Sequence, residues 1–511
     1  MQAKRWLYLV HRWLGIALCV VMALWFLSGM VMLYVGYPKL TTEERLQGLP
    51  PLPAAGCCVP ISQALAAAGM AQGPGAPLAA ARQGKPAPAT ISWRLTSVAG
   101  APRYVLGDAS RTLVAVDARS GQRIGPVQAA DALASARGFA PGQAVQHLDS
   151  IHEDAWTHSR ALDAHRPLHV VAVSDEARRW LYISSRTGEV VRDASFTERS
   201  WGWIGAWLHW LYMFRGGALN PWWTDIVIWL SVAATVATVT GLVVGVMRWR
   251  FRDRYRSGRR TPYPGRMARW HHVLGLVGGA LCLTWIVSGL LSVNPWKVFD
   301  APGPKPEHNA FAGGPLQADA ALPAGQVLAE LQRHGLVAKS LEWRRAAGQH
   351  LVLAEGPGGP WLLGPQGLLP QGLPMASWLP AAQAMLPRAR LVSQEKISQF
   401  DAYYYAREAH TMTGQRERPL PIWRLKFDDP QQTWISIDPA TGSVVQVLGS
   451  RRRADRWLFA FLHSFDLPVF LSARPLWDVW MLGFSLAGLG MGLTGVVTGI
   501  RRLRRKFGGA T

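Results

Sequence analysis

Four long apolar segments constrain this chain more than any other feature. Each has roughly 20 or more mostly apolar residues, enough to cross the hydrocarbon core of a bilayer, and Trp or Tyr lies at several of their ends. The first is too long for the apolar part of a signal peptide and has no small-residue cleavage site after it, so we expect a retained anchor. The predicted membrane spans are residues 13–34, 222–247, 270–293 and 475–500.

The positive charge of the chain gathers on one side of these spans. The formal net charge is +22, but nine Arg and only one acid, Asp253, occupy residues 248–269, and five cations occupy residues 501–506. Three more cations lie beside the first span. This is the positive-inside pattern. Membrane topology and lipid headgroups account for the net charge, so no nucleic-acid partner is expected. We expect a four-pass membrane protein with both termini cytoplasmic and two large regions outside, in the periplasm if the cell is Gram-negative.

The two halves of the chain are similar to each other. A shift of 260 residues aligns "HRWLG", which begins at His11, with "HHVLG", which begins at His271. A shift of 254 aligns "WLHWLYMF" with "FLHSFDLP", so that His209 meets His463. We interpret the chain as a tandem duplication whose parallel halves are related by an axis along the membrane normal.

The exported segments alternate apolar and polar residues and end in Gly-containing turns, as in "LVAVDARSG" and "WISIDPATG". Ala-rich stretches at 131–137 and 320–334 have helical spacing. The predicted fold class is a membrane protein, mainly an α transmembrane bundle of four spans, with two small α+β exported domains. The predicted organisation is a first span (1–34), a periplasmic region (35–200), a re-entrant or interfacial helix with the second span (201–249), a basic cytoplasmic loop (250–269), the third span (270–293), a second periplasmic region (294–455), a second re-entrant or interfacial helix with the fourth span (456–503) and a cytoplasmic tail (504–511).

Histidines recur in two matched pairs, His11 with His271 and His209 with His463, at the ends of these segments. A single histidine there is most often an interfacial residue, but ionisable groups in spans are costly and tend to be functional. Paired across a two-fold axis, two imidazoles can act as the axial ligands of a b-type haem. Zinc fits less well because no Cys, Asp or Glu accompanies either pair. No C-x-x-C-H motif is present, so covalent attachment of haem is not expected.

Several motifs resemble the PepSY-associated transmembrane family of bacterial inner-membrane proteins. They are "VHRWLG…SG", "DAYYY", "RPLPIW", "WISIDPATG" and "RWLFAFLHSFDLP", in an order that covers nearly the whole chain, although the first half has "DAWTH" in place of "DAYYY". The resemblance implies PepSY-like periplasmic domains and, in some members, haem-dependent reduction of ferric siderophores. The resemblance also implies that particular histidines of this chain are haem ligands. These are His11, His209, His271 and His463, with His272 as a secondary candidate because Arg12 stands at the corresponding position of the first half.

We therefore predict a membrane oxidoreductase with two haem b groups that reduces a ferric siderophore. Its electrons would come from a quinol or a cytoplasmic donor, because the glycines in "GLVVGVMRW" and "GLGMGLTG" lie inside spans and no flavin or nicotinamide fingerprint is present. The alternative is a non-catalytic PepSY anchor that binds or regulates a periplasmic partner such as a peptidase.

Three local predictions remain. The aromatic segments 201–214 and 456–470 carry little charge between their ends, so we expect them to dip between the spans and carry His209 and His463 inward. For Cys57–Cys58 the sequence favours an inert pair over a strained vicinal disulfide.

A group of exported histidines is a candidate metal or ferric-chelate site, although loop histidines often bind nothing. The group comprises His147, His152, His158, His165 and His169, with His410 from the second half.

Overall fold

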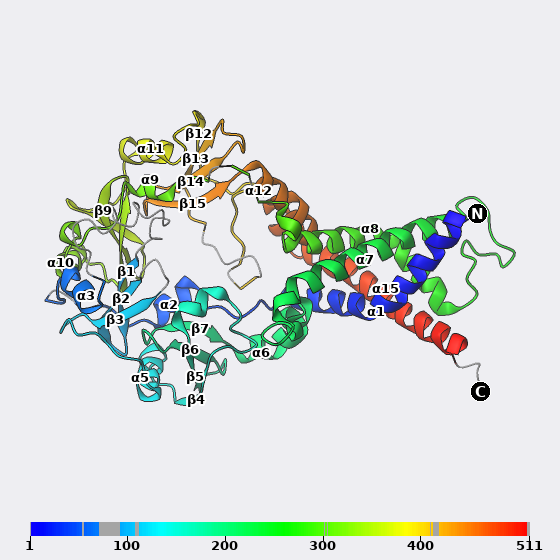
Figure 1. The fold of residues 1–511 in the computed structure, drawn as a ribbon, viewed down its shortest axis with the longest axis horizontal. Coiled ribbons are helices and arrows are strands. Elements are labelled where there is room, and N and C mark those ends of the chain that lie inside the picture. Colours follow the sequence, from blue (N-terminus) through cyan, green and yellow to red (C-terminus); the bar gives the residue numbers. More distant parts are fainter. Residues whose placement is uncertain are drawn as a thin grey trace.

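The fold is a helical bundle joined to a β-rich region, which we call the head (Figure 1). The structure is a computed structural model that describes residues 2–53, 56–70, 92–107, 112–300, 302–303, 305–408, 410–411 and 418–507. Both ends of the chain lie at the end of the bundle away from the head (Figure 1).

The bundle consists of the predicted spans. Its helices are α1 (Gln2–Met32), α7 (Trp223–Arg248), α8 (Arg266–Ser292) and α15 (Leu476–Phe507). All four are long and apolar enough to cross a membrane, which confirms the four spans. The helices extend beyond the predicted spans at the end away from the head, because α1 begins at Gln2 and α8 at Arg266. His11 and His271 therefore lie inside their helices and not at the helix starts.

Glycines bring the helices of the bundle close together. A Cβ added at Gly492 of α15 would lie 2.9 Å from the Cβ of Ala23 on α1, and one at Gly488 would lie 2.5 Å from the ring of Phe26. Small residues at such contacts allow the close helix packing that membrane proteins use. These contacts hold α1 and α15 close together.

The head contains strands and short helices from both halves of the chain. The first half contributes α2 (Thr42–Gly48), α3 (Ile61–Ala67), β1 (Ser92–Val98), β2 (Ala101–Gly107), β3 (Leu113–Asp117), α5 (Ala129–Phe139), β4 (Val145–Ile151), β5 (Leu168–Val173), β6 (Trp180–Ser184), β7 (Val190–Ala194) and α6 (Phe196–Gly202). The second half contributes α9 (His308–Ala312), α10 (Ala324–Arg333), β8 (Ser340–Ala346), β9 (Gln349–Glu355), β10 (Trp361–Gly364), β11 (Gly367–Leu368), α11 (Met375–Ala384), β12 (Leu391–Ile397), β13 (Ile422–Phe427), β14 (Trp434–Asp438), β15 (Ser443–Leu448) and α12 (Ser450–Asp455).

One sheet joins the two halves, a connection between the two exported regions that the sequence did not predict. Its strand order is β11-β10-β9-β8-β1-β2-β3, and β1 pairs antiparallel with β8 so that Leu95 lies opposite Leu341. Trp93 and Trp343 are also opposite each other, and both are buried. The pairing covers an edge on each half that would otherwise expose unpaired backbone groups.

Each half also has a four-stranded antiparallel sheet of its own, ordered β4-β5-β6-β7 and β12-β13-β14-β15. The predicted turns are confirmed, since Gly121 has φ +73° and Gly442 has φ +65°, values that favour glycine. The helix expected at 131–137 is α5. The helix expected at 320–334 is shorter, because α10 begins only at Ala324, directly after Pro323.

The two aromatic segments between head and bundle are not the continuous helices that their spacing suggested. In the first, π-helical turns cover Trp203–Trp207 and Gly205 has the non-helical ψ of −108°. In the second, π-helical turns cover Arg456–Phe461. Leu211 (φ +55°) and Phe465 (φ +48°) then reverse the chain two residues after each histidine. Each aromatic segment is therefore broken close to its histidine.

The cysteine prediction was wrong in one respect. Cys57 and Cys58 form a disulfide, where the sequence favoured an inert pair. Cys19 and Cys282 are free and buried in the bundle, as expected for small packing residues.

Candidate functional site

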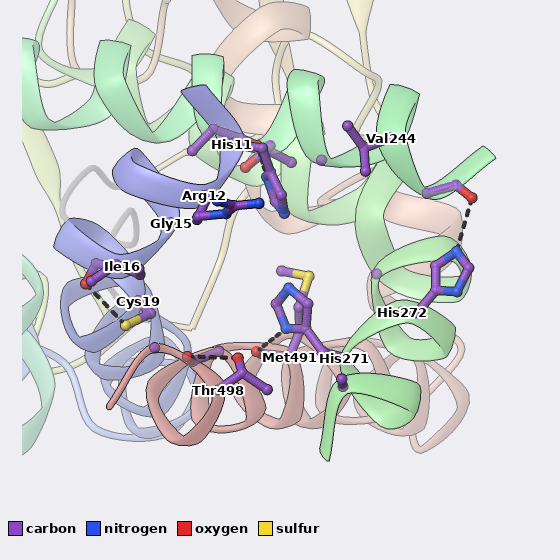
Figure 2. A pocket seen from close by; sticks show the side chains of 18 of the residues that line it. His11, Arg12, Gly15, Ile16, Cys19, Val244, His271, His272, Met491 and Thr498 are labelled. Atoms are coloured by element: carbon purple, nitrogen blue, oxygen red, sulfur yellow. Dashed lines mark hydrogen bonds between the residues drawn. The ribbon is translucent and has the colours of Figure 1, made fainter. Parts of the chain in front are cut away.

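The structure brings together the members of each histidine pair. The ring centroids of His11 on α1 and His271 on α8 are 6.2 Å apart, and Figure 2 shows the two side chains facing one another across a cavity. The ring centroids of His209 and His463 are likewise 6.2 Å apart. Four residues spread over more than 450 positions thus form two equivalent pairs.

Backbone carbonyls fix the protonation of the first pair. His11 Nδ1 lies 2.9 Å from the Ala237 carbonyl oxygen, and His271 Nδ1 lies 3.0 Å from that of Met491. A carbonyl can only accept, so each Nδ1 carries the proton. Each Nε2 therefore keeps its lone pair, which is the form of imidazole that binds a metal.

Serine hydroxyls fix the protonation of the second histidine pair. His209 Nδ1 lies 3.0 Å from Ser28 Oγ, and His463 Nδ1 lies 3.0 Å from Ser288 Oγ. Each serine donates its own proton to the carbonyl of the tryptophan three residues earlier, at 3.1 Å. Each Oγ must therefore accept from Nδ1–H, which again leaves Nε2 unprotonated. A histidine that binds a metal through one ring nitrogen usually donates its other N–H to such an acceptor.

The 6.2 Å spacing suits a single metal ion between the two rings of a pair. Two metal–nitrogen bonds of about 2 Å each, plus about 1 Å from each nitrogen to its ring centre, span about 6 Å. In the part of the chain that the structure describes, no group of three or more His, Cys, Asp or Glu is placed to hold a metal. Any further ligands of such an ion would have to come from a bound molecule or from outside these groups of described residues.

Each pair lies in the wall of a cavity. The distal cavity, of about 430 Å³, contains His11 and His271, and the proximal cavity, of about 450 Å³, contains His209 and His463 and lies next to the head. Volumes of this size are typical of cofactor sites. Their described walls are mostly apolar and contain no Asp or Glu.

Two details of the walls indicate space for a flat ligand. A Cβ added at Gly15 in the distal cavity would meet nothing within 4 Å. In the proximal cavity the buried indole nitrogen of Trp285 has no hydrogen-bond partner among the described residues. An open glycine face and an orphaned donor both fit a porphyrin, which is planar and carries polar substituents.

The cavities approach each other inside the bundle. His11 and Ser28 are 17 residues apart on α1, or about 25 Å at 1.5 Å per residue. Met22 lies between these positions and lines both cavities. The two cavities therefore come close to each other at Met22, although their histidines are much farther apart.

Sequence reasoning missed several residues that shape these sites. Ser28 and Ser288 were part of the aligned "SG" motif but were not assigned as histidine partners. Gly241 is required because a Cβ there would lie 2.5 Å from His11 Cε1. The shift of 254 residues that aligns His209 with His463 also aligns Gly241 with Gly495, but only the contact in the folded chain shows why glycine is needed.

His272, the secondary candidate, has a different role in the structure. Its Nδ1 is 2.8 Å from Thr261 Oγ1 and its Nε2 is 2.8 Å from the Gly245 carbonyl oxygen. Figure 2 shows it pointing away from His11 and His271. With both nitrogens bonded, His272 holds the connection between α7 and α8 and is not placed as a ligand.

The histidines of the head do not converge on one site. His147 Nε2 lies 3.2 Å from His169 Nδ1, whereas His158 pairs with Glu153. Burial lowers the pKa of His165. The carbonyl of His152 accepts from Arg166. These contacts are structural in character, and the described residues form no metal group here.

His410 instead links the two halves of the chain. Its Nε2 lies 2.8 Å from Glu44 Oε1 and its Nδ1 lies 3.5 Å from Glu198 Oε1. The bond to Glu198, with the charge of Glu44, raises the pKa of His410 to about 9. His410 is therefore protonated at neutral pH and acts as a cationic bridge.

Comparison with known proteins identifies the family. No curated protein matches the chain. The model of the PepSY-associated TM region matches residues 8–354, which is more than half of the chain and includes His11, His209 and His271. His463 and His410 lie beyond the matched range. With this match over most of its length, the chain belongs to the PepSY-associated TM family.

Proposed function

We propose that the protein is a haem-b oxidoreductase that passes electrons across the bacterial inner membrane to a ferric siderophore. The observation that carries this proposal is the recurrence of one arrangement at two sites. Each site has two imidazoles 6.2 Å apart, with Nδ1 hydrogen-bonded and Nε2 unprotonated. Histidines with a purely structural role would not need the same ring spacing and the same pattern of hydrogen bonds at two sites.

The walls of both cavities support haem as the ligand. Haem would supply a one-electron Fe(III)/Fe(II) couple at each site. His11 and His271 would hold it in the distal cavity, and His209 and His463 in the proximal cavity. The apolar walls exclude water, and the serine or carbonyl acceptors keep each ring in one orientation.

The positions of the two sites suggest that the distal site would accept electrons and the proximal site would donate them. The distal cavity reaches Arg12 and Arg502, close to both termini, where the positive-inside pattern predicts the cytoplasm. A quinol or a cytoplasmic protein is the proposed donor there. The proximal cavity adjoins the head and would serve the periplasmic acceptor.

A ferric siderophore is the proposed acceptor because the family resemblance suggests it and the chemistry is simple. One electron reduces Fe(III) to Fe(II), and the oxygen-rich chelator binds Fe(II) much more weakly, so the metal is released. The chain need only hold the chelate near the proximal site. No covalent step is required.

The decisive experiment is a haem count on the purified wild-type protein. We expect a low-spin absorption spectrum and two haems per chain by pyridine haemochrome. His11→Ala or His271→Ala should remove one haem, and His209→Ala or His463→Ala the other. His334→Ala, which changes an exposed histidine of the head, should keep both. A folded wild-type protein without a Soret band would favour the non-catalytic anchor instead.

The side of the reaction needs a separate experiment. A membrane-impermeant ferric chelate added to intact spheroplasts should oxidise the reduced protein. Reaction only with inverted vesicles would place the acceptor on the cytoplasmic side and overturn the proposed direction.

A further inference from the structure

Both cavities contain arginine but no acid among their described wall residues. Arg12 of α1 and Arg502 of α15 line the distal cavity. Arg407 is the one charged side chain among the described residues that line the proximal cavity. This pattern does not depend on the histidines, and it favours an anionic ligand in an otherwise apolar space.

Arg407 comes from the head and not from the bundle. Its side chain is only 11% exposed, and its Nη1 lies 3.3 Å from Ser464 Oγ, next to His463. Asp466 is 3.9 Å away but is already bonded by Arg456 at 2.8 Å and by Tyr405. Arg456, and not Arg407, is therefore the nearest ionic partner of Asp466.

Two contacts hold the Arg407 loop against the first half of the chain. His410 bridges Glu44 and Glu198, and Lys39 Nζ donates to the Thr411 carbonyl oxygen at 2.8 Å. Thr411 also lines the proximal cavity. The head thus presents Arg407 to the cavity on an anchored loop.

We infer that Arg407 binds a carboxylate of the group held in the proximal cavity, while Arg12 and Arg502 do so in the distal cavity. The inference rests on the proposed function, since haem b is apolar except for two carboxylates. A guanidinium pairs with a carboxylate through charge-assisted, often bidentate, hydrogen bonds. The distal site would then be completed by the bundle alone, and the proximal site only by the docked head.

The test combines a substitution with a change in the ligand. The full-length His271→Ala protein, which should keep only the proximal haem, is compared with the same protein carrying Arg407→Ala, and both are loaded with haem b or with its dimethyl ester. For haem b, we expect Arg407→Ala to accelerate loss to an excess haem acceptor by about ten- to one-hundredfold. For the ester, which has no carboxylate, the substitution should have little effect. Arg390→Ala, at an exposed arginine of the head, is the matched control.

The outcomes separate this inference from the proposed function. If the His271→Ala protein binds no haem while the wild type also binds none, the proposed function fails. If it binds haem but Arg407→Ala accelerates loss of haem and ester equally, Arg407 has only a structural role through Ser464 and Asp466, and the inference is overturned. An unchanged rate of loss for both ligands overturns it as well.

Discussion

The distal and proximal cavities hold the same pair of histidines in different ways. In the distal cavity, both histidines lie on spanning helices, and their Nδ1 atoms bond to backbone carbonyls of α7 and α15. In the proximal cavity, both lie on broken segments beside the head, and their partners are serine side chains. The distal site is therefore built by helix packing alone, and the proximal site depends on contacts that side-chain substitutions can remove.

The largest expected effect is on the second proximal segment. Asp466 is fully buried and accepts from Arg456 and Tyr405, so Asp466→Asn leaves the buried Arg456 uncompensated at a cost of about 3–5 kcal/mol. We expect the proximal haem to be lost and the distal haem to stay. A haem count and chemical denaturation measure both effects. Asp428→Asn, in an exposed ion pair of the head, is the control. Loss of both haems in a folded protein would contradict the independence of the two sites.

Gly241→Ala should give the reverse result. Its new Cβ would lie 2.5 Å from His11 Cε1, whereas one at Gly29 would lie 3.7 Å from His209 Cε1, an ordinary contact. Gly241→Ala should therefore empty the distal site alone, and Gly29→Ala should leave both occupied. The absorption spectra of the two variants, compared with those of the single-histidine variants, show which site has lost its haem. Equal haem loss from both variants would mean that close packing does not distinguish the cavities.

Ser28→Ala should have a smaller effect, confined to the proximal redox potential. Without the acceptor, His209 becomes a less basic ligand that stabilises the oxidised metal less, so the midpoint potential should rise by about tens of millivolts. Ser28→Thr keeps a hydroxyl and should stay near the wild-type value. Potentiometric titration measures the shift. A change in the distal potential instead would show that the assignment of the two sites is inverted.

The smallest effect concerns the bridge between His410 and its two glutamates. The pKa of His410 is raised from 6.5 to about 9, so the bridge contributes fully below pH 6.5 and its contribution is lost as pH rises through 9. His410 is about half exposed, so the effect on stability is small. The difference in thermal midpoint between wild type and His410→Gln should shrink from pH 6.5 to pH 9.5. Asp193 and Lys39 titrate nearby in both proteins, and His334→Gln is the control. A constant difference would exclude the charged bridge.

Much of the site was predictable because it repeats. His11, His209, His271 and His463 were found by aligning the chain with itself, since the same local sequence recurs at matching distances. The four spans follow from apolar length, and turns such as the one at Gly442 follow from the conformational freedom of glycine. These features are local, so neighbouring residues suffice to predict them. The tandem duplication itself remains a prediction from the sequence.

Other features depended on contacts between distant residues. No local pattern shows that β1 pairs with β8, so the sheet shared by the two halves could not be predicted from the sequence. His272 looked like a ligand beside His271, yet its position on the helix turns it toward Thr261. The role of Ser28 also required the structure, because its partner His209 is 181 residues away.

The sequence by itself determined a four-span membrane protein with two histidine pairs, because hydrophobicity, charge placement and repetition are properties of the chain. Only the tertiary structure decided that each pair faces across a cavity with Nε2 unprotonated, that Met22 lines both cavities and that the head supplies Arg407. The physical reason is that side-chain direction and hydrogen-bond partners are fixed by packing between segments far apart in sequence, and that packing exists only in the folded protein.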